Sequence, residues 1–190
     1  MGRNADIYWI NLVLEGNINA FRNIVDLYKD RAFNLALKIC NNREEAEEIL
    51  QDSFLKAFRS LAEFRKESSF KTWFYRIVFN TSISHLRIKR TGITFSDVNF
   101  AENTDYAEFN TYEYISESEY NKALIDHAFK TLRDDEKGII SMFYYDELSV
   151  AEIADITGES VSNIKVKLHR SRKRMLDALT WIRTGEISVK

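Results

Sequence analysis

The chain has 190 residues, of which 45% are hydrophobic and 13% aromatic, which suits one or two globular domains and excludes wholesale disorder. It contains no proline and one cysteine, Cys40, which excludes a disulfide framework and is typical of a cytoplasmic protein. Its 27 basic and 29 acidic residues give a formal net charge of −2, and we find no apolar run typical of a transmembrane helix or a leader peptide.

The first 61 residues are expected to form three helices. The first covers residues 5–14 and is broken by Gly16-Asn17. Apolar residues at helical spacing predict a second helix over residues 19–39. Asn42 is suited to cap a third helix over residues 43–61, which buries one apolar stripe and presents acidic residues on its other face. An acidic helix face is usually only solvated, so on its own this one indicates no function.

A fourth helix is expected over residues 69–90, SFKTWFYRIVFNTSISHLRIKR, with more aromatic residues than one core stripe requires. Tyr75 and Phe79 fall outside the stripe and lie among basic residues. Aromatic rings beside cations suit the stacking of unpaired bases and the binding of phosphates. A well-packed core explains the same aromatic residues, and both interpretations remain open at this point.

Charge is segregated along the chain. Residues 64–90 contain seven basic side chains and one acid, whereas every charge in residues 91–120 is acidic. The acidic stretch also loses helical periodicity, so residues 92–118 are predicted to be a flexible linker. Because a second basic segment follows, the pattern indicates two contacts with one polyanion.

The last part of the chain predicts a helix-turn-helix. Periodicity returns at residue 119, and Asp134 is expected to cap a helix. Ser149 and Glu152 form a capping-box pattern, Gly158 suits a tight turn, and Ser160 suits the N-cap of the next helix. A small residue, a turn glycine and a buried aliphatic residue therefore occupy the positions at which a helix-turn-helix needs them.

The second helix of this motif has polar and basic residues outside its apolar stripe. Such groups suit base edges and phosphates in the major groove. The candidate DNA-binding residues are Ser160, Ser162, Asn163, Lys165, Val166, Lys167, Arg170 and Lys173. The alternative is a solvated basic helix in an ordinary bundle, which the agreement of cap, turn, stripe and charge disfavours.

Catalytic and metal-binding patterns are missing from the sequence. The three histidines are far apart and lie in no metal-binding spacing, and six glycines leave little room for a phosphate loop. We therefore expect a binding protein rather than an enzyme, with no cofactor and no metal.

Several of these stretches, in one order, resemble a known family. They are EEAEEILQDSFLKAF, then SFKTWFYRIVFN with the ending LRIKR, then the linker, then SVAEIADITGESVSNIKVKLHRSRKRML. The chain resembles the small extracytoplasmic-function (ECF) sigma factors of the sigma-70 family. The resemblance implies a bacterial transcription initiation factor that binds the RNA polymerase core, through its largest and second-largest subunits, and promoter DNA.

The resemblance also implies roles for residues. The acidic helix is expected to bind the coiled coil of the largest polymerase subunit through Glu45, Glu48, Gln51, Asp52 and Phe54. The fourth helix is expected to melt and hold the −10 element through Lys71, Trp73, Tyr75, Arg76, Asn80, Arg87, Lys89 and Arg90, with Asn80 reading a flipped base. The helix-turn-helix residues given above are expected to read the −35 element.

The expected protein is all-α and has two helical domains, residues 1–91 and 119–190, joined by the flexible acidic linker 92–118. An anti-sigma factor is an expected further partner, and direct membrane insertion is not expected. Two rival functions stay open: a stand-alone helix-turn-helix transcriptional regulator, and a polymerase-binding adaptor without DNA contact.

Overall fold

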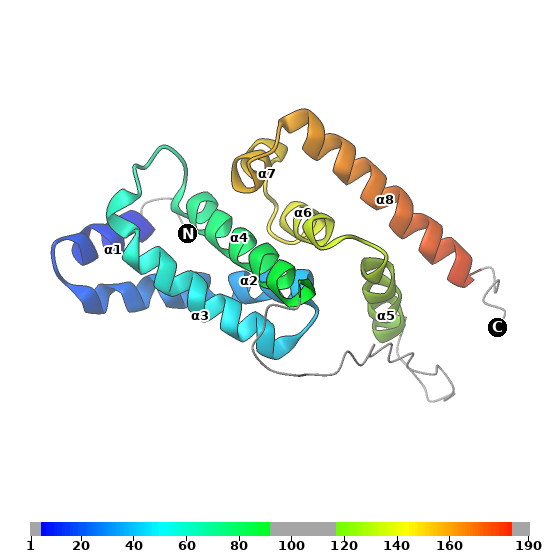
Figure 1. Cartoon of the computed structure of the whole chain (residues 1–190), viewed down its shortest axis with the longest axis horizontal. Coiled ribbons are helices and arrows are strands. Elements are labelled where there is room, and N and C mark those ends of the chain that lie inside the picture. Colours follow the sequence, from blue (N-terminus) through cyan, green and yellow to red (C-terminus); the bar gives the residue numbers. More distant parts are fainter. Residues whose placement is uncertain (1–4, 92–116, 184–190) are drawn as a thin grey trace.

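The computed structural model describes residues 5–91 and 117–183, and these form α-helices and short 3-10 helices joined by turns (Figure 1). The expected all-α class is confirmed. The α-helices of these ranges are α1 (Ala5–Leu14), α2 (Phe21–Cys40), α3 (Arg43–Arg59), α4 (Phe70–Arg90), α5 (Glu117–Lys130), α6 (Asp134–Tyr144), α7 (Val150–Thr157) and α8 (Val161–Arg183). The 3-10 turns Ile18–Ala20 and Leu61–Glu63 precede α2 and follow α3.

Local capping sets the starts of α3 and α4. The side chain of Asn42 accepts a hydrogen bond from the Glu45 amide at 3.0 Å, which confirms the expected cap of α3. Ser69 caps α4 in the same way, accepting from the Thr72 amide at 3.0 Å. Both bonds satisfy amides that have no partner within the helix.

Aromatic residues fill the core of the first helical unit, α1–α4. Phe74 is fully buried, and its ring stacks on Phe54 at a centroid distance of 4.7 Å. Phe70 also stacks on Phe74, at 6.0 Å, and Tyr28 of α2 packs edge-on against Phe74. Rings at these distances add favourable pair energies to the burial of apolar area.

In the second helical unit, α5–α8, the helix α6 starts with a different cap residue from the one expected. Arg133, not Asp134, is the N-cap residue, because its backbone is extended and its amide donates to the Glu136 carboxylate at 3.0 Å. Asp134 is already the first residue of the helix, where the positive end of the helix dipole stabilises a negative side chain.

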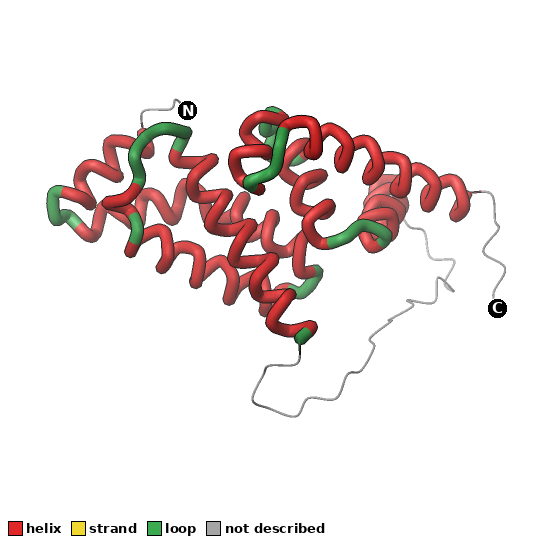
Figure 2. The backbone as a smooth tube through the Cα atoms, turned by 45° about the horizontal axis from the view of Figure 1, so that its top comes forward, coloured by secondary structure: helices red, strands yellow, loops and turns green. Residues whose placement is uncertain are grey.

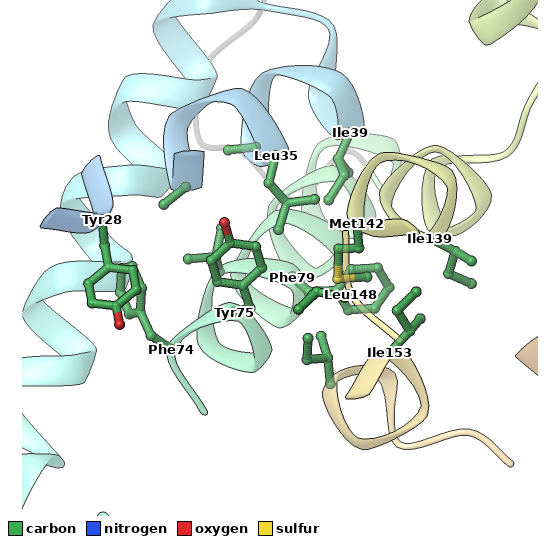
Figure 3. Close-up of a cluster of buried hydrophobic side chains, with 14 of the residues drawn as sticks. Tyr28, Leu35, Ile39, Phe74, Tyr75, Phe79, Ile139, Met142, Leu148 and Ile153 are labelled. Atoms are coloured by element: carbon green, nitrogen blue, oxygen red, sulfur yellow. The ribbon is translucent and has the colours of Figure 1, made fainter. Parts of the chain in front are cut away.

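The two helical units pack directly on each other, with α6 and α7 lying along α2 and α4 (Figures 1 and 2). Their buried residues form one continuous cluster, in which Phe79 and Tyr75 of α4 lie close to Met142 and Leu148 of the second unit (Figure 3). Tyr75 is 0% exposed and Phe79 is 5% exposed. The excess aromatic residues of α4 are therefore core residues, which corrects the idea that these two rings are free to stack on bases.

Most of the predicted linker falls outside the described residues. Residues 92–116 are not described, and α5 begins at Glu117, within the last two residues of the predicted linker. The domain boundaries at residues 91 and 119 and the flexibility of the linker stay predictions. No helix in the described ranges is long and apolar enough to span a membrane.

Candidate nucleic-acid and polymerase interfaces

An acidic face runs along α3. We use this name for Glu44, Glu48, Gln51, Asp52 and Leu55, which are all exposed and recur at helical spacing. Among the described residues, the side chains of Glu48, Gln51 and Asp52 form no hydrogen bond or ion pair. The acidic face is therefore available for a basic partner without breaking contacts within the chain.

Two residues expected on this surface are directed elsewhere. Phe54 is only 9% exposed and belongs to the aromatic core. Glu45 pairs with Lys89 of α4 at 2.6 Å, its other carboxylate oxygen lies 3.4 Å from His85 Nε2, and its side chain is 15% exposed. The structure therefore removes Phe54 from the contact surface and gives Glu45 and Lys89 a role in joining α3 to α4.

A polar strip lies on the exposed side of α4. It consists of Arg76, Asn80, Ser84 and Arg87, which follow one another about one turn apart on the same face. Asn80 and Arg87 are exposed, and within the described part of the chain neither side chain has a bonded partner. Trp73 is half-buried two turns before Asn80, with its ring against Phe64 and Phe70.

Four candidate residues of α4, among them Arg76 of the polar strip, are bonded to the second helical unit. Tyr75 donates from its hydroxyl to the Asp146 carboxylate at 2.7 Å, and Lys71 donates to the Asp146 carbonyl at 2.9 Å. Arg76 donates to the Asp155 carbonyl, from Nε at 2.8 Å. Arg90 pairs with Asp134 at 2.5 Å. In this arrangement Tyr75 is inaccessible to DNA, which is a correction to the predicted site.

Burial shifts the pKa values of two charged groups at this contact. It raises the pKa of the Asp146 carboxyl, and the hydrogen bond from Tyr75 and the positive charge of Lys71 only partly offset it. Burial also lowers the pKa of Lys71, against the effect of the Asp146 charge. The Asp146 carboxyl is therefore buried where the units meet, and the Lys71 ammonium group is partly buried beside it.

The helix-turn-helix forms as the sequence predicts. Ser149 and Glu152 make both bonds of the capping box, with the Glu152 amide 3.2 Å from Ser149 Oγ and the Ser149 amide 2.9 Å from Glu152 Oε2. Gly158 adopts φ 74°, a left-handed conformation that glycine adopts without strain. The Asn163 amide donates to Ser160 Oγ at 3.2 Å, as expected for an N-cap.

Buried and exposed residues lie on opposite sides of α8. Ile164 and Leu168 are buried, which turns the other side of the helix outward. The exposed residues on that side include Ser162, Lys165, Val166, Arg170 and Lys173. Short polar, methyl-bearing and cationic groups on one exposed helix face can contact the base-edge donors and acceptors and the thymine methyl groups of the major groove.

Two of the expected DNA contacts on α8 have partners within the chain. Lys167 binds Asp135 at 2.7 Å and Glu159 at 2.6 Å. Burial acts to lower the pKa of Lys167, but these bonds outweigh it and the pKa is raised. Asn163 donates to Glu159 at 2.7 Å. Lys167 therefore ties α8 to α6, and among the candidate residues the cations Lys165, Arg170 and Lys173 have no partner in the described part of the chain.

No group of three or more histidine, cysteine or acidic side chains among the described residues could hold a metal ion. Cys40 is half-buried, and burial raises the pKa of its thiol, which disfavours the reactive thiolate.

Two family models match the two helical units. Sigma-70 region 2 matches residues 24–91, and Sigma-70 region 4 matches residues 122–175. The ECF RNA polymerase sigma factor SigW of Bacillus subtilis is 31% identical over 174 residues, which cover 87% of this chain and 92% of SigW. The chain belongs to the ECF sigma factors.

Other relatives of this sigma factor agree along its length. The RNA polymerase sigma-H factor of Pseudomonas aeruginosa is 27% identical over 184 residues, which cover 93% of this chain and 95% of the relative. The solved structure of CnrH in complex with the cytosolic domain of CnrY has a TM-score of 0.65 at 17% identity, covering 91% of this chain and 96% of CnrH. RpoE of Bartonella quintana, solved with the anti-sigma factor NepR, has a TM-score of 0.60 at 23% identity, covering 84% and 96%.

Three residues of this sigma factor were missed by the sequence reasoning. Asp146, through its carboxylate and its carbonyl, and Asp155, through its backbone carbonyl, accept hydrogen bonds from α4, and Gly138 of α6 lies against Phe79 of α4. A glycine inside a helix was the only signal for this close approach, because it weakens the helix unless something else requires it. The two acids gave no signal at all.

Proposed function

We propose that this sigma factor directs the RNA polymerase core to promoters through three surfaces. The acidic face of α3 binds the coiled coil of the largest polymerase subunit. The polar strip of α4 holds the melted −10 element, and the exposed side of α8 reads the −35 element as a duplex. The protein acts in the cytoplasm, and its own residues perform no catalysis.

One observation carries the proposal: the chain combines an acidic face and a helix-turn-helix whose charged groups lack partners among the described residues with an exposed Asn80. A stand-alone regulator would need only the helix-turn-helix, and an adaptor would need only the acidic face. Binding energy from stacking and hydrogen bonding to extruded bases explains how DNA is opened without nucleotide hydrolysis.

A protein inhibitor is a further proposed partner. The RpoE relative in the comparison is bound to the anti-sigma factor NepR, and its chain aligns with most of this one. We propose that this sigma factor is also held by an anti-sigma factor until a signal releases it.

Run-off transcription tests the main proposal. Bacterial core polymerase is supplied with a pool of promoter fragments, with and without this protein. We expect new start sites that depend on the protein and share two sequence elements. Binding to core without new start sites would favour an adaptor. If core does not bind the protein, a stand-alone regulator would be favoured.

The −35 contact predicts a change in salt dependence. Replacing Lys165 and Arg170 by glutamine should weaken binding to a −35 duplex selected in the run-off assay. The logarithmic salt slope should fall by about one unit for each lost phosphate contact, because fewer counterions are released. Fluorescence anisotropy at several salt concentrations measures the slope.

Exposed lysines of α5 provide the control for that experiment. Lys122→Gln with Lys130→Gln changes the net charge equally at exposed positions outside the helix-turn-helix. This pair should leave the slope unchanged. If the α8 pair also leaves it unchanged, these two cations do not touch the DNA backbone.

A further inference from the structure

The turn between α7 and α8 (Figure 1) contains Glu159, whose two carboxylate oxygens have different partners. Oε1 lies 2.6 Å from the ammonium group of Lys167, which also binds Asp135 of α6 at 2.7 Å. Oε2 accepts a hydrogen bond from Nδ2 of Asn163 at 2.7 Å. Because Lys167 is itself held by α6, the Glu159 carboxylate is fixed in place, and its side chain is only 22% exposed.

Asn163 is exposed and lies in the first turn of α8. It precedes Arg170 by two turns and shares its helix face, which is the side of α8 that we propose meets the −35 element. In helix-turn-helix proteins, residues near the N-terminus of the second helix contact base edges. The Asn163 carboxamide is therefore placed to meet a base.

The carboxylate determines which way this carboxamide is turned. A carboxylate only accepts hydrogen bonds, so Asn163 must direct its NH2 group, and not its oxygen, towards Glu159. Oδ1 and the second N–H remain for a base. Adenine offers one donor, N6, and one acceptor, N7, which match this pair. Guanine offers two acceptors, O6 and N7, and one of them would face Oδ1.

We propose that Glu159 is a positioning residue for base recognition, which holds the Asn163 carboxamide so that it accepts adenine and rejects guanine at one position of the −35 element. The inference rests on the proposed reading of that element by α8. Asn163 touches the base, and Glu159 acts through Asn163. Part of the specificity then comes from an unfavourable contact with the wrong base.

Replacing Glu159 by glutamine should reverse the preference. Glutamine has a single accepting oxygen, and the Lys167 ammonium group, which only donates, takes it. The NH2 group of the glutamine then faces Asn163, so the Asn163 carboxamide turns over and directs both of its N–H groups towards the base. Two donors match O6 and N7 of guanine. Glu159→Ala leaves the carboxamide without a partner, so the preference should disappear.

Selection from a randomised duplex measures the preference. The full-length protein is combined with core polymerase and bound to a pool of promoter duplexes, taken from a run-off start site, in which the −35 element is randomised. Sequencing of the bound and input pools gives the enrichment of each base. At one position the wild type should favour adenine over guanine at least about fivefold. Glu159→Ala should bring this ratio to about one, and Glu159→Gln should favour guanine at least about threefold.

Two further variants are controls. Glu147→Gln makes the same chemical change at an exposed position before α7, and it should keep the wild-type preference at every position. Adding Asn163→Ala to Glu159→Gln should abolish the guanine preference, because no carboxamide then faces the base. Circular dichroism and the affinity for core check that each variant is folded.

A merely structural role of Glu159 predicts that both Glu159 variants lose affinity for all sequences and keep the wild-type base preferences, and this result would overturn the proposal. A guanine preference that survives Asn163→Ala would overturn it as well. If the wild type enriches no base anywhere in the element, the proposal and the proposed role of α8 fail together. An enriched element in which no adenine responds to Glu159 would refute this proposal alone.

Discussion

Charge reversal on the acidic face, Glu48→Lys with Asp52→Lys, is expected to weaken binding to core polymerase by at least about a hundredfold. Both side chains are exposed and, among the described residues, unpaired, so the variant loses no contact within the chain. Placing lysines opposite a basic partner creates like-charge contacts that cost several kcal/mol. A hundredfold loss corresponds to about 2.8 kcal/mol, which lies within that range. Fluorescence anisotropy of labelled protein titrated with core measures the affinity.

The matched control places the same charge change on another surface. Asp30→Lys with Glu63→Lys also adds four positive charges, at exposed positions outside the acidic face. We expect at most a small, salt-dependent change in affinity from this pair, because distant exposed charges are screened. Equal losses from both pairs would mean that overall charge, and not the face of α3, governs binding. No loss from either would place the polymerase contact elsewhere.

Helix limits were predictable from the sequence wherever a cap determines them. Asn42, Ser149 and Gly158 act on amides or carbonyls within four residues of themselves, so the residues that decide each end are neighbours in the sequence. Arg133 shows where the same reasoning fails. The Glu136 side chain supplies the bond to its amide, and the favoured cap residue Asp134 lies one position too late.

The exposed faces of the candidate site were also predictable, because helical spacing divides a helix into a buried and an outward side. Glu48, Asp52, Asn80, Lys165 and Arg170 all point outward as expected. Helical spacing describes one helix at a time, however. It does not show that a second helix covers the outward side.

Contacts between distant segments account for the partners that the sequence did not predict. Tyr75 meets Asp146 across 71 residues of sequence, and Lys167 meets Asp135 across 32. Such pairs depend on how α4, α6 and α8 pack, and packing depends on many apolar contacts together. A tyrosine among cations looks the same in sequence whether a base or another helix covers it. This is why a core residue was predicted to be a DNA-binding one.

The largest effect on promoter opening is expected from Asn80→Ala. Asn80 is exposed, unpaired within the described chain and central in the polar strip of α4, and its amide can both donate to and accept from a base edge. Readout of a base is worth about 1–3 kcal/mol, so open-complex formation should fall roughly five- to 150-fold. Permanganate footprinting of unpaired thymines on a promoter selected by run-off measures it.

Asn34→Ala is the control, because Asn34 is an exposed asparagine inside α2, and the same change there should leave promoter opening as it is in the wild type. Affinity for core should be unchanged in both variants, since neither residue lies on the acidic face of α3. A normal open complex with Asn80→Ala would show that the extruded base is held by other groups of α4. Loss of core binding would instead show that α4 itself contacts polymerase, and the separation of roles between α3 and α4 would be wrong.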